Sequence, residues 1–410
     1  MGPFFSRLAK DLRAEGWNVF KINFNGGDSL FYRGRNSVPY RGTLEDWPQF
    51  LSDKVAEWGI SHILLFGDMR HYHKMVTDLS GLFGAKVYVF EEGYLRPNFI
   101  TLEKDGVNGR SSIPRDPAFF NKVTPLSEQE TRSPKLPFTK TTLYTIAYFL
   151  ATHLAKWRYP YYKHHRNFSW AEAYIWIRSG IRKINYRQNE QGIQEELTGT
   201  LSGKYFLAIL QVHNDAQIRE WSDIPSASAF IKRTIKSFAR DGNPDEFLVF
   251  KHHPLDRGYS DYKPLIRQLA RKYNIKDRVY YIHDQHLPTL LKHARGTLVI
   301  NSTVGLSSLL HNTPVYVCGH AVYDMPGLTF QGILEDFWKQ PGEVNKELNQ
   351  QFRKYLICAN QINGHFYAKA KPSKSQSGLD IKQLNNILSR ETSTVENPEE
   401  CSLNPITKRA

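Results

Sequence analysis

The sequence predicts an α/β protein with two domains, each built on a parallel sheet covered by helices. Short apolar runs alternate with amphipathic stretches along most of the chain, a pattern typical of parallel strands joined by crossover helices. The alternation occurs in two regions, and 410 residues are enough for two or three domains. A hydrophobic fraction of 40% with 23% charged residues is ordinary for a folded protein and excludes global disorder.

The first α/β region begins with a helix that ends near Gly16, because Leu8 and Leu12 recur at helical spacing among charged residues. A strand is expected over 17–24, and the Asn-Gly-Gly-Asp sequence of 25–28 predicts a turn. The next expected elements are a helix over 44–58, a strand over 62–66, a helix over 71–81 and a strand over 86–90. A doubly wound domain usually begins with a strand, so we expect its first strand to lie upstream of Met1.

A stretch of different composition, residues 134–195, separates the two regions. Residues 151–190 contain eight Lys or Arg, two Glu and nine aromatic residues, so they carry six of the chain's net fourteen positive charges. Basic residues mixed with Trp and Tyr suit the surface of an anionic membrane. The alternative is a helical pair packed between domains with its cations in solvent. The longest apolar run has about nine residues, whereas a spanning helix needs about 20.

The second α/β region runs from about 205 to 330. Its expected strands cover 205–210, 246–250, 279–282, 297–300 and 315–317, and its expected helices cover 227–239, 262–273, 287–293 and 304–311. A helical stretch is expected over 335–362. Ligands bind beyond the carboxyl ends of the strands in open parallel sheets, so the turns that follow the strands are the candidate sites.

One such turn follows the strand at 297–300 and opens a helix. Its residues are Asn301, Ser302, Thr303, Val304 and Gly305. Free N–H groups and a partial positive charge at a helix N-terminus favour phosphate, the two hydroxyls add donors, and the glycine permits close approach of a ligand. The alternative is that Ser302 or Thr303 is only the N-cap of the helix.

A second turn follows the strand at 246–250. Its residues are Lys251, His252, His253 and Pro254. A histidine here can pair with a phosphate oxygen or protonate a leaving group near neutral pH, and the proline fixes the turn. An ordinary polar turn is the alternative. Metal binding by the adjacent histidines is disfavoured, because no clear cluster of further ligands accompanies them.

A third turn, which runs from Gln211 to Asp215, follows the strand at 205–210. It brings a carboxylate to the same sheet edge, where Asp215 can act as nucleophile, base or charge stabiliser. An Asn-Asp pair also forms ordinary turns and N-caps. His283 and Asp284, after the strand at 279–282, are weaker evidence of the same kind.

Carboxylates also end the strand at 86–90 in the first region. The string reads Glu91, Glu92, Gly93, Tyr94, Leu95, Arg96 and Pro97. Neighbouring carboxylates are costly to bury without a purpose, although a salt-bridged surface turn is the alternative. Asp68 to Arg70 and Gly26 to Asp28 end two further strands. We expect these turns to face the phosphate-binding turns across a shared cleft, as in a transferase that uses a nucleotide-activated donor.

Four of these strings resemble the capsule polysaccharide biosynthesis proteins of the KpsS type. In chain order they are Glu91 to Pro97, Gln211 to Asp215, Lys251 to Pro254 and Asn301 to Thr303, and the resemblance extends from about Gly2 to Tyr367. The resemblance implies a GT-B fold with two Rossmann-like domains that face a cleft, and a helical aromatic-basic insertion. It also implies transfer of Kdo from CMP-β-Kdo, with retention, to a phosphatidylglycerol-type lipid, which initiates the poly-Kdo linker of a capsule. The expected divisions are an acceptor domain (1–133), the helical basic segment (134–195), a CMP-sugar domain (196–334), C-terminal helices (335–370) and, outside the resemblance, a polar tail (371–410) that we expect to be disordered.

The resemblance also suggests roles for individual residues. Asp215 would be the nucleophile, Glu92 the group that acts on the acceptor hydroxyl, and His253 the catalytic partner of the leaving CMP. Arg96 would pair with the Kdo carboxylate. The other residues expected to bind substrate are Lys251, Pro254, Asn301, Ser302, Thr303, Gly305, Gln211 and Glu91.

The expected partners are the nucleotide sugar, the lipid acceptor and an anionic membrane surface, with no cofactor and no metal. The protein would work in the cytoplasm, peripherally on the inner face of the cytoplasmic membrane, beside a partner Kdo transferase and the capsule exporter. Two alternatives stay open: a CDP-polyol phosphotransferase, and a non-catalytic basic protein that binds polyanions. Nucleic acid is disfavoured, because no recognised nucleic-acid-binding motif is present.

Overall fold

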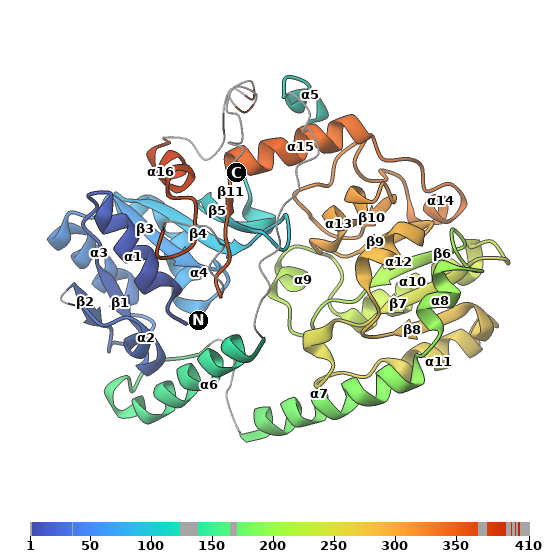
Figure 1. The fold of residues 1–410 in the computed structure, drawn as a ribbon, viewed down its shortest axis with the longest axis horizontal. Helices are drawn as coiled ribbons and strands as arrows, with labels where there is room; N and C mark the ends of the chain where they lie inside the picture. Colours follow the sequence, from blue (N-terminus) through green and yellow to red (C-terminus); the bar gives the residue numbers. More distant parts are fainter. Residues whose placement is uncertain are drawn as a thin grey trace. The chain divides into compact units, whose positions relative to one another are not determined.

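The computed structural model describes residues 2–34, 36–123, 138–164, 170–367 and 375–390, together with residues 395, 398 and 401 (Figure 1). The chain forms two compact units. Unit 1 comprises residues 1–112, 127–168 and 356–397, and unit 2 comprises residues 113–126, 169–355 and 398–410. The predicted mixed α/β architecture with parallel sheets is confirmed. Within the described ranges, no helix is both long enough and apolar enough to cross a membrane.

Unit 2 is built on a five-stranded, all-parallel sheet with strand order β10-β9-β6-β7-β8 (Figure 1). The strands are β6 (Tyr205–Ile209), β7 (Phe247–Lys251), β8 (Val279–Ile282), β9 (Gly296–Val299) and β10 (Val315–Val317). All five were expected from the sequence. The chain runs outward from β6 to β8 and then returns to β9 on the other side of β6. The strand order therefore reverses at β6, which is where open α/β sheets bind ligands.

Helices cover this sheet, and their buried faces account for the core of unit 2. In α10, Ser226 caps the helix by accepting from the amide of Ala229 (3.2 Å), and Phe230, Ile231 and Phe238 are fully buried. The helices of the unit are α7 (Trp170–Asn189), α8 (Ile193–Thr198), α9 (Ala216–Glu220), α10 (Ala227–Asp241), α11 (Lys263–Lys272), α12 (Leu287–His293), α13 (Val304–Leu310), α14 (Leu334–Lys339) and, in its first part, α15 (Lys346–Ala359). The short α5 (Pro117–Phe120) also belongs to unit 2.

Unit 1 has a mixed sheet, which corrects the expectation of a Rossmann-like parallel sheet in this region. Its order is β11-β5-β4-β3, and only β3 and β4 are parallel. The strands are β3 (His62–Phe66), β4 (Lys86–Glu92), β5 (Phe99–Lys104) and β11 (Gln361–Asn363). Only a few residues join β4 to β5, too few for a crossover helix, so the two strands pair antiparallel. A separate parallel pair joins β1 (Lys21–Asn23) to β2 (Ser37–Pro39). The remaining N-terminal helices are α1 (Phe4–Ala14), α3 (Trp47–Trp58) and α4 (His71–Asp78).

The turn expected at 25–28 is instead the start of a helix, α2 (Gly26–Phe31). The side chain of Asn25 caps it by accepting from the amide of Asp28 (3.0 Å). A Cβ on Gly26 would lie 2.0 Å from the backbone oxygen of Ala151 in α6 (Phe138–Leu154). The glycine therefore serves close packing of two helices, and the ligand role expected for this turn has no support.

The C-terminal expectations were wrong in two places. The helix expected over 335–362 is interrupted between α14 and α15 by Pro341 and by Gly342, whose φ is +75°. The tail expected to be disordered from residue 371 contains α16 (Ile381–Ser389), which buries Leu384 and Leu388 in the core of unit 1.

Candidate active site

Strand register places the polar turns of unit 2 at one level of the sheet. In the pairing of β6 with β9, Phe206 lies opposite Gly296. Continued past the strand ends, this register places Gln211 opposite Asn301. The register of β6 with β7 in the same way places Gln211 opposite His253. Residues distant in the sequence therefore meet where the strand order reverses.

Gln211 connects two of these turns and is only 6% exposed. Its Nε2 donates to Asp215 Oδ2 and to Asn301 Oδ1, each at 3.0 Å. Its Oε1 accepts from the amide of Asn301 at 3.2 Å. Asp215 is also the N-cap of α9, because its Oδ1 accepts from the amide of Gln217 at 3.0 Å. The structure thus brings three predicted residues, Gln211, Asp215 and Asn301, into one hydrogen-bonded group.

This group fixes the Asp215 carboxylate in a partly buried position, with one hydrogen bond to each oxygen. A carboxylate oxygen can accept more than one hydrogen bond, so the Asp215 carboxylate keeps lone pairs that can attack a reacting centre. Asn301 has a different role. Its Nδ2 donates to the backbone oxygen of Gln217 (2.9 Å) while its Oδ1 accepts from Gln211. Its side chain therefore positions the turn that carries Asp215.

His253 lies on the neighbouring turn and is partly buried. Its Nδ1 accepts from the amide of Leu255 at 3.2 Å, so the neutral ring carries its proton on Nε2. Pro254 opens the short 3-10 turn η4 (Pro254–Asp256) and fixes the backbone at this point. The imidazole is therefore held in one tautomer, with Nε2 as its hydrogen-bond donor.

Lys251, the last residue of β7, is 6% exposed and donates from Nζ to the backbone oxygen of His283 at 2.6 Å. Burial lowers the pKa of Lys251 to about 8, although the nearby carboxylates of Asp284 and Glu190 oppose the shift. The side chain predicted to bind substrate therefore braces the end of β8.

His283 is held by Glu190, which was not among the residues predicted from the sequence. Its Nδ1 and its amide reach the two carboxylate oxygens of Glu190 at 2.5 and 3.0 Å, and the Tyr186 ring stacks on its imidazole with a centroid distance of 3.5 Å. Burial opposes ionisation of Glu190, but the hydrogen bonds from His283 lower its pKa. Glu190 and Tyr186 lie at the end of α7, so this helix is fastened to the end of β8.

The turn that begins α13 differs from its expected form at the glycine. A Cβ on Gly305 would lie 2.1 Å from the hydroxyl of Tyr323, and that hydroxyl donates to the backbone oxygen of Ser302. Tyr323 is therefore a close neighbour that requires a glycine at this position, and the expected approach of a ligand to Gly305 stays a prediction. Ser302 Oγ accepts from the amide of Val304 (3.3 Å), whereas the Thr303 side chain makes no capping bond.

A histidine–aspartate pair beside Asp215 was missed in the sequence. Asp256 Oδ1 accepts from the amide and from Nδ1 of His213, at 3.2 and 2.5 Å. Asp256 is fully buried, and the His213 ring lies 4.9 Å from the Tyr259 ring. The position of Asp256, two residues after Pro254 in the same turn, was the available signal. The pair orients an imidazole on the turn that carries Asp215.

The other predicted residues, Glu91, Glu92 and Arg96, lie in unit 1 at and after the end of β4. Glu91 Oε1 accepts from the amide of Glu92 at 3.0 Å. Burial raises the pKa of Glu91 to about 7, although the Glu92 amide and the Arg70 guanidinium oppose the shift. Arg96 is exposed, and its Nε donates to the backbone oxygen of Gly93 at 3.4 Å.

Asp68 and Glu103 of unit 1 also have buried carboxyl groups. Asp68 is 1% exposed, and its Oδ2 accepts from the amide of Val107 at 3.1 Å. Glu103 is 3% exposed, and its Oε2 accepts from the Ser111 hydroxyl at 2.5 Å. Burial raises the pKa of both, that of Glu103 to about 7. The end of β4 therefore lies in a unit that carries carboxyl groups able to hold protons near neutral pH.

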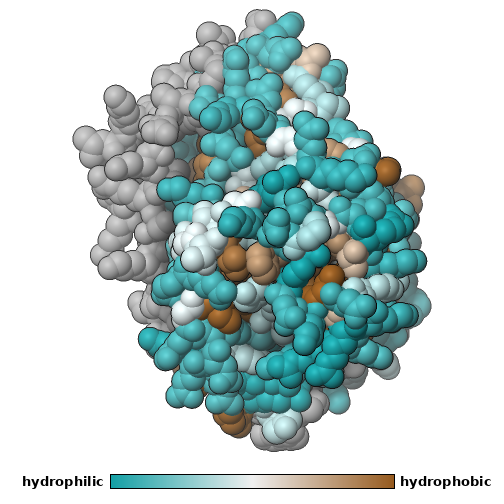
Figure 2. Space-filling view, turned by 90° about the vertical axis from the view of Figure 1, so that its right-hand side faces the viewer, coloured by the Kyte–Doolittle hydropathy of each residue, from teal (hydrophilic) through white to brown (hydrophobic). Residues whose placement is uncertain are grey.

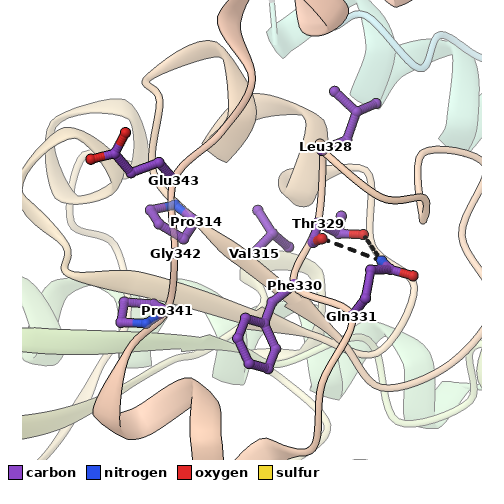
Figure 3. A pocket seen from close by; sticks show the side chains of 10 residues that line it. Pro314, Val315, Leu328, Thr329, Phe330, Gln331, Pro341, Gly342 and Glu343 are labelled. Atoms are coloured by element: carbon purple, nitrogen blue, oxygen red, sulfur yellow. Dashed lines mark hydrogen bonds between the residues drawn. The ribbon is translucent and has the colours of Figure 1, made fainter. Parts of the chain in front are cut away.

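A small pocket of about 160 Å³ lies at the opposite edge of the unit 2 sheet, where Pro314 and Val315 begin β10 (Figure 3). Gln331 donates from Nε2 to the Thr329 hydroxyl (2.8 Å) and backbone oxygen (3.3 Å) at its wall. Because the predicted residues follow the carboxyl ends of the strands, this pocket is separate from them.

A family model described as capsule polysaccharide biosynthesis protein matches residues 61–367. The capsule polysaccharide export protein KpsS of Escherichia coli is 39% identical, over 90% of this chain and 95% of that protein. The capsule polysaccharide modification protein LipB of Neisseria meningitidis serogroup B is also 39% identical, over 92% of each chain.

Two solved structures of Thermosulfurimonas dismutans KpsC are similar to this chain at lower sequence identity. The β-Kdo 2,7 transferase has a TM-score of 0.42 and 16% identity, and covers 90% of this chain and 99% of that one. The β-Kdo 2,4 transferase has a TM-score of 0.40 and 14% identity, and covers 86% of this chain and 91% of that one.

Proposed function

The chain belongs to the capsule polysaccharide biosynthesis protein family, and from this premise we propose that it is a retaining glycosyltransferase. Its donor is CMP-β-Kdo and its acceptor is a phosphatidylglycerol-type lipid, so that it initiates the poly-Kdo linker of a capsule. The observation that carries the proposal is the Asp215 carboxylate, fixed by Gln211 at the point where the strand order of a parallel sheet reverses.

In this proposal the donor binds at the carboxyl edge of the unit 2 sheet. His253 donates from Nε2 to the phosphate of CMP, and the hydroxyls of Ser302 and Thr303 add further hydrogen bonds. The support is local: Leu255 fixes the tautomer of His253, and the Thr303 side chain is not used as a helix cap. These groups stabilise the monophosphate as it leaves, without a metal or cofactor.

The reaction then proceeds in two displacements. An Asp215 oxygen attacks the anomeric carbon of Kdo, and the bond from that carbon to the phosphate oxygen breaks, with the electron pair leaving on CMP. The acceptor hydroxyl next attacks the same carbon, the bond to Asp215 breaks, and the hydroxyl proton passes to a base. Two inversions give net retention, which accounts for a β product from a β donor.

The base in the second displacement is Glu92, which ends β4 in unit 1. Its neighbour Glu91 binds the acceptor, and the exposed guanidinium of Arg96 pairs with the Kdo carboxylate. The proposal places the enzyme at the inner face of the cytoplasmic membrane, where it acts on its lipid beside a partner Kdo transferase and the capsule exporter. The basic excess of residues 151–190 supports attraction to an anionic surface.

The test is incubation of the purified protein with CMP-Kdo and a short-chain phosphatidylglycerol, followed by mass spectrometry of the lipid. The expected product carries one added Kdo, and sustained CMP release requires the acceptor. A parallel incubation with a CDP-polyol distinguishes the proposed Kdo transferase from the alternative, a CDP-polyol phosphotransferase. Turnover of the CDP-polyol with none of CMP-Kdo, or binding of any polyanion without turnover of either donor, contradicts the proposal.

A further inference from the structure

Helix α7 of unit 2 exposes a row of large apolar side chains. The members of this row and their exposures are Tyr174 (62%), Ile177 (64%), Ile181 (55%) and Ile184 (62%). Successive members are three or four residues apart, and side chains at this spacing lie on one face of a helix. Apolar surface in contact with water is unfavourable, so a continuous row needs an explanation that a single exposed residue does not.

The opposite face of α7 is fastened to unit 2. Arg182 donates to the backbone oxygens of Arg257 and Ser260 at 2.8 and 3.1 Å, and Tyr186 stacks on His283. Nearer the start of the helix, the Tyr259 hydroxyl donates to the carboxylate of Glu172. The apolar row is therefore not the side through which α7 packs on the core of unit 2, because the helix already packs there through its other side.

Cations border the row on both sides. At 100° per residue, Arg187 and, further round the helix, Lys183 lie along one flank, and Arg178 lies along the other, whereas Arg182 is held by unit 2. The helix contains these four basic residues and a single acidic residue, Glu172. An apolar stripe between two basic flanks is the arrangement of a helix that lies in the plane of an anionic lipid surface.

Helix α6 of unit 1 exposes a second apolar row, with exposed cations just beyond its C-terminal end. Its exposed row consists of Leu143 (63%), Ile146 (48%), Leu150 (56%) and Leu154 (66%). Its other face packs on α2, where Tyr148 is 8% exposed. Immediately after the helix, Trp157 is 82% exposed between exposed Lys156 and Arg158, which suits the level of the lipid headgroups. Residues 138–164 contain no Asp or Glu.

In the described part of the chain, the exposed large apolar residues outside α6 and α7 do not form such rows. Figure 2 shows one face of the molecule, on which hydrophilic residues predominate and hydrophobic residues occur in small separate groups. Leu310 and Ile333 of unit 2, at 52% and 60% exposure, are single residues of this kind and provide matched controls.

We propose that the apolar rows of α6 and α7 insert into the headgroup region of an anionic bilayer, with their flanking cations on the lipid phosphates. The inference deepens the proposed function and rests on it for the identity of the acceptor lipid. A second copy of the chain fits less well, because it would present the same cations to the cations of α7. An anionic lipid supplies both an apolar phase and the opposite charge.

The test compares an α7 variant (Ile177→Asp with Ile181→Asp), an α6 variant (Leu150→Asp with Leu154→Asp) and a control variant (Leu310→Asp with Ile333→Asp). Flotation with vesicles of phosphatidylglycerol and phosphatidylcholine measures binding without any donor. We expect each row variant to bind about tenfold more weakly, the control to bind like the wild type, and salt to weaken wild-type binding. Circular dichroism checks that the variants fold.

Row variants that fold and bind the vesicles as tightly as the wild type overturn the inference. So does a change from dimer to monomer in the row variants with vesicle binding unchanged, because the rows would then be a contact between copies. Transfer to a monomeric short-chain acceptor is measured separately. Failure of the wild type to transfer Kdo to any acceptor refutes the proposed function and leaves the vesicle result to decide the inference.

Discussion

Replacing Gln211 by methionine tests the hydrogen-bonded group that holds Asp215. The two side chains have similar length and volume, so the change removes polar groups with little cavity formation. Gln211 is 6% exposed, so water cannot easily replace the hydrogen bonds that its side chain makes. The variant leaves Asp215 Oδ2 and two polar groups of Asn301 without the partner that Gln211 supplies.

The magnitude follows from the three bonds that are lost. The two bonds between Gln211 and Asn301 join neutral groups and contribute about 1 kcal/mol each, and the bond to the Asp215 carboxylate contributes about 2 kcal/mol. We therefore expect Gln211→Met to lower the free energy of unfolding by about 4 kcal/mol. In a double-mutant cycle, Gln211→Met and Asn301→Ala should show a coupling energy of about 1 kcal/mol, because alanine keeps the amide that bonds to Gln211 Oε1 and removes only the side-chain bond.

Urea denaturation measures these differences, with the transition followed by both circular dichroism and tryptophan fluorescence. Gln268→Met, at an exposed position of α11, is the matched control and should change stability by less than about 0.5 kcal/mol. If Gln211→Met destabilises no more than this control, Gln211 does not hold the two turns together, and the geometry assigned to Asp215 is wrong.

Three further changes have expected outcomes. Burial raises the pKa of Glu103 from 4.5 to about 7, so the stability that the protonated carboxyl contributes is fully present below pH 4.5 and is lost as pH rises through 7. In thermal unfolding, Glu103→Gln should therefore increase the free energy of unfolding by about 2 kcal/mol at pH 8.5 and by little at pH 5. Equal effects at the two pH values would contradict this. Gly305→Ala should cost about 2 kcal/mol by urea denaturation, because its Cβ would meet the Tyr323 hydroxyl, and an unchanged midpoint would show that the space exists. Asp256→Ala should release the His213 ring, seen by NMR as loss of a slowly exchanging Nδ1 proton; persistence of that signal would exclude the pair.

The sequence predicted unit 2 well because its signals are local. Each apolar strand alternates with an amphipathic helix, and all five strands lie within one residue of their expected ends. Parallel pairing then brings the turns after β6, β7 and β9 to one edge. This is why Gln211, Asp215 and Asn301 were correctly expected near one another.

Unit 1 was predicted less well because its pairings are not local. Strand β11 joins the sheet by placing Gln361 opposite Thr101, and no periodicity links two segments so far apart. The contact between Glu190 and His283 escaped prediction for the same reason. The packing roles of Gly26 and Gly305 were not predicted, because a glycine required by a neighbouring side chain or backbone looks the same in sequence as one required by a ligand.

The most direct test of the central claim is to trap the first displacement. The wild type is mixed with CMP-Kdo without acceptor, quenched with acid and digested, and its peptides are analysed by mass spectrometry. We expect one Kdo residue on the peptide that contains Asp215, with one equivalent of CMP released, and neither with Asp215→Ala. Full transfer to the lipid by folded Asp215→Ala, or an adduct on another residue, would contradict the account.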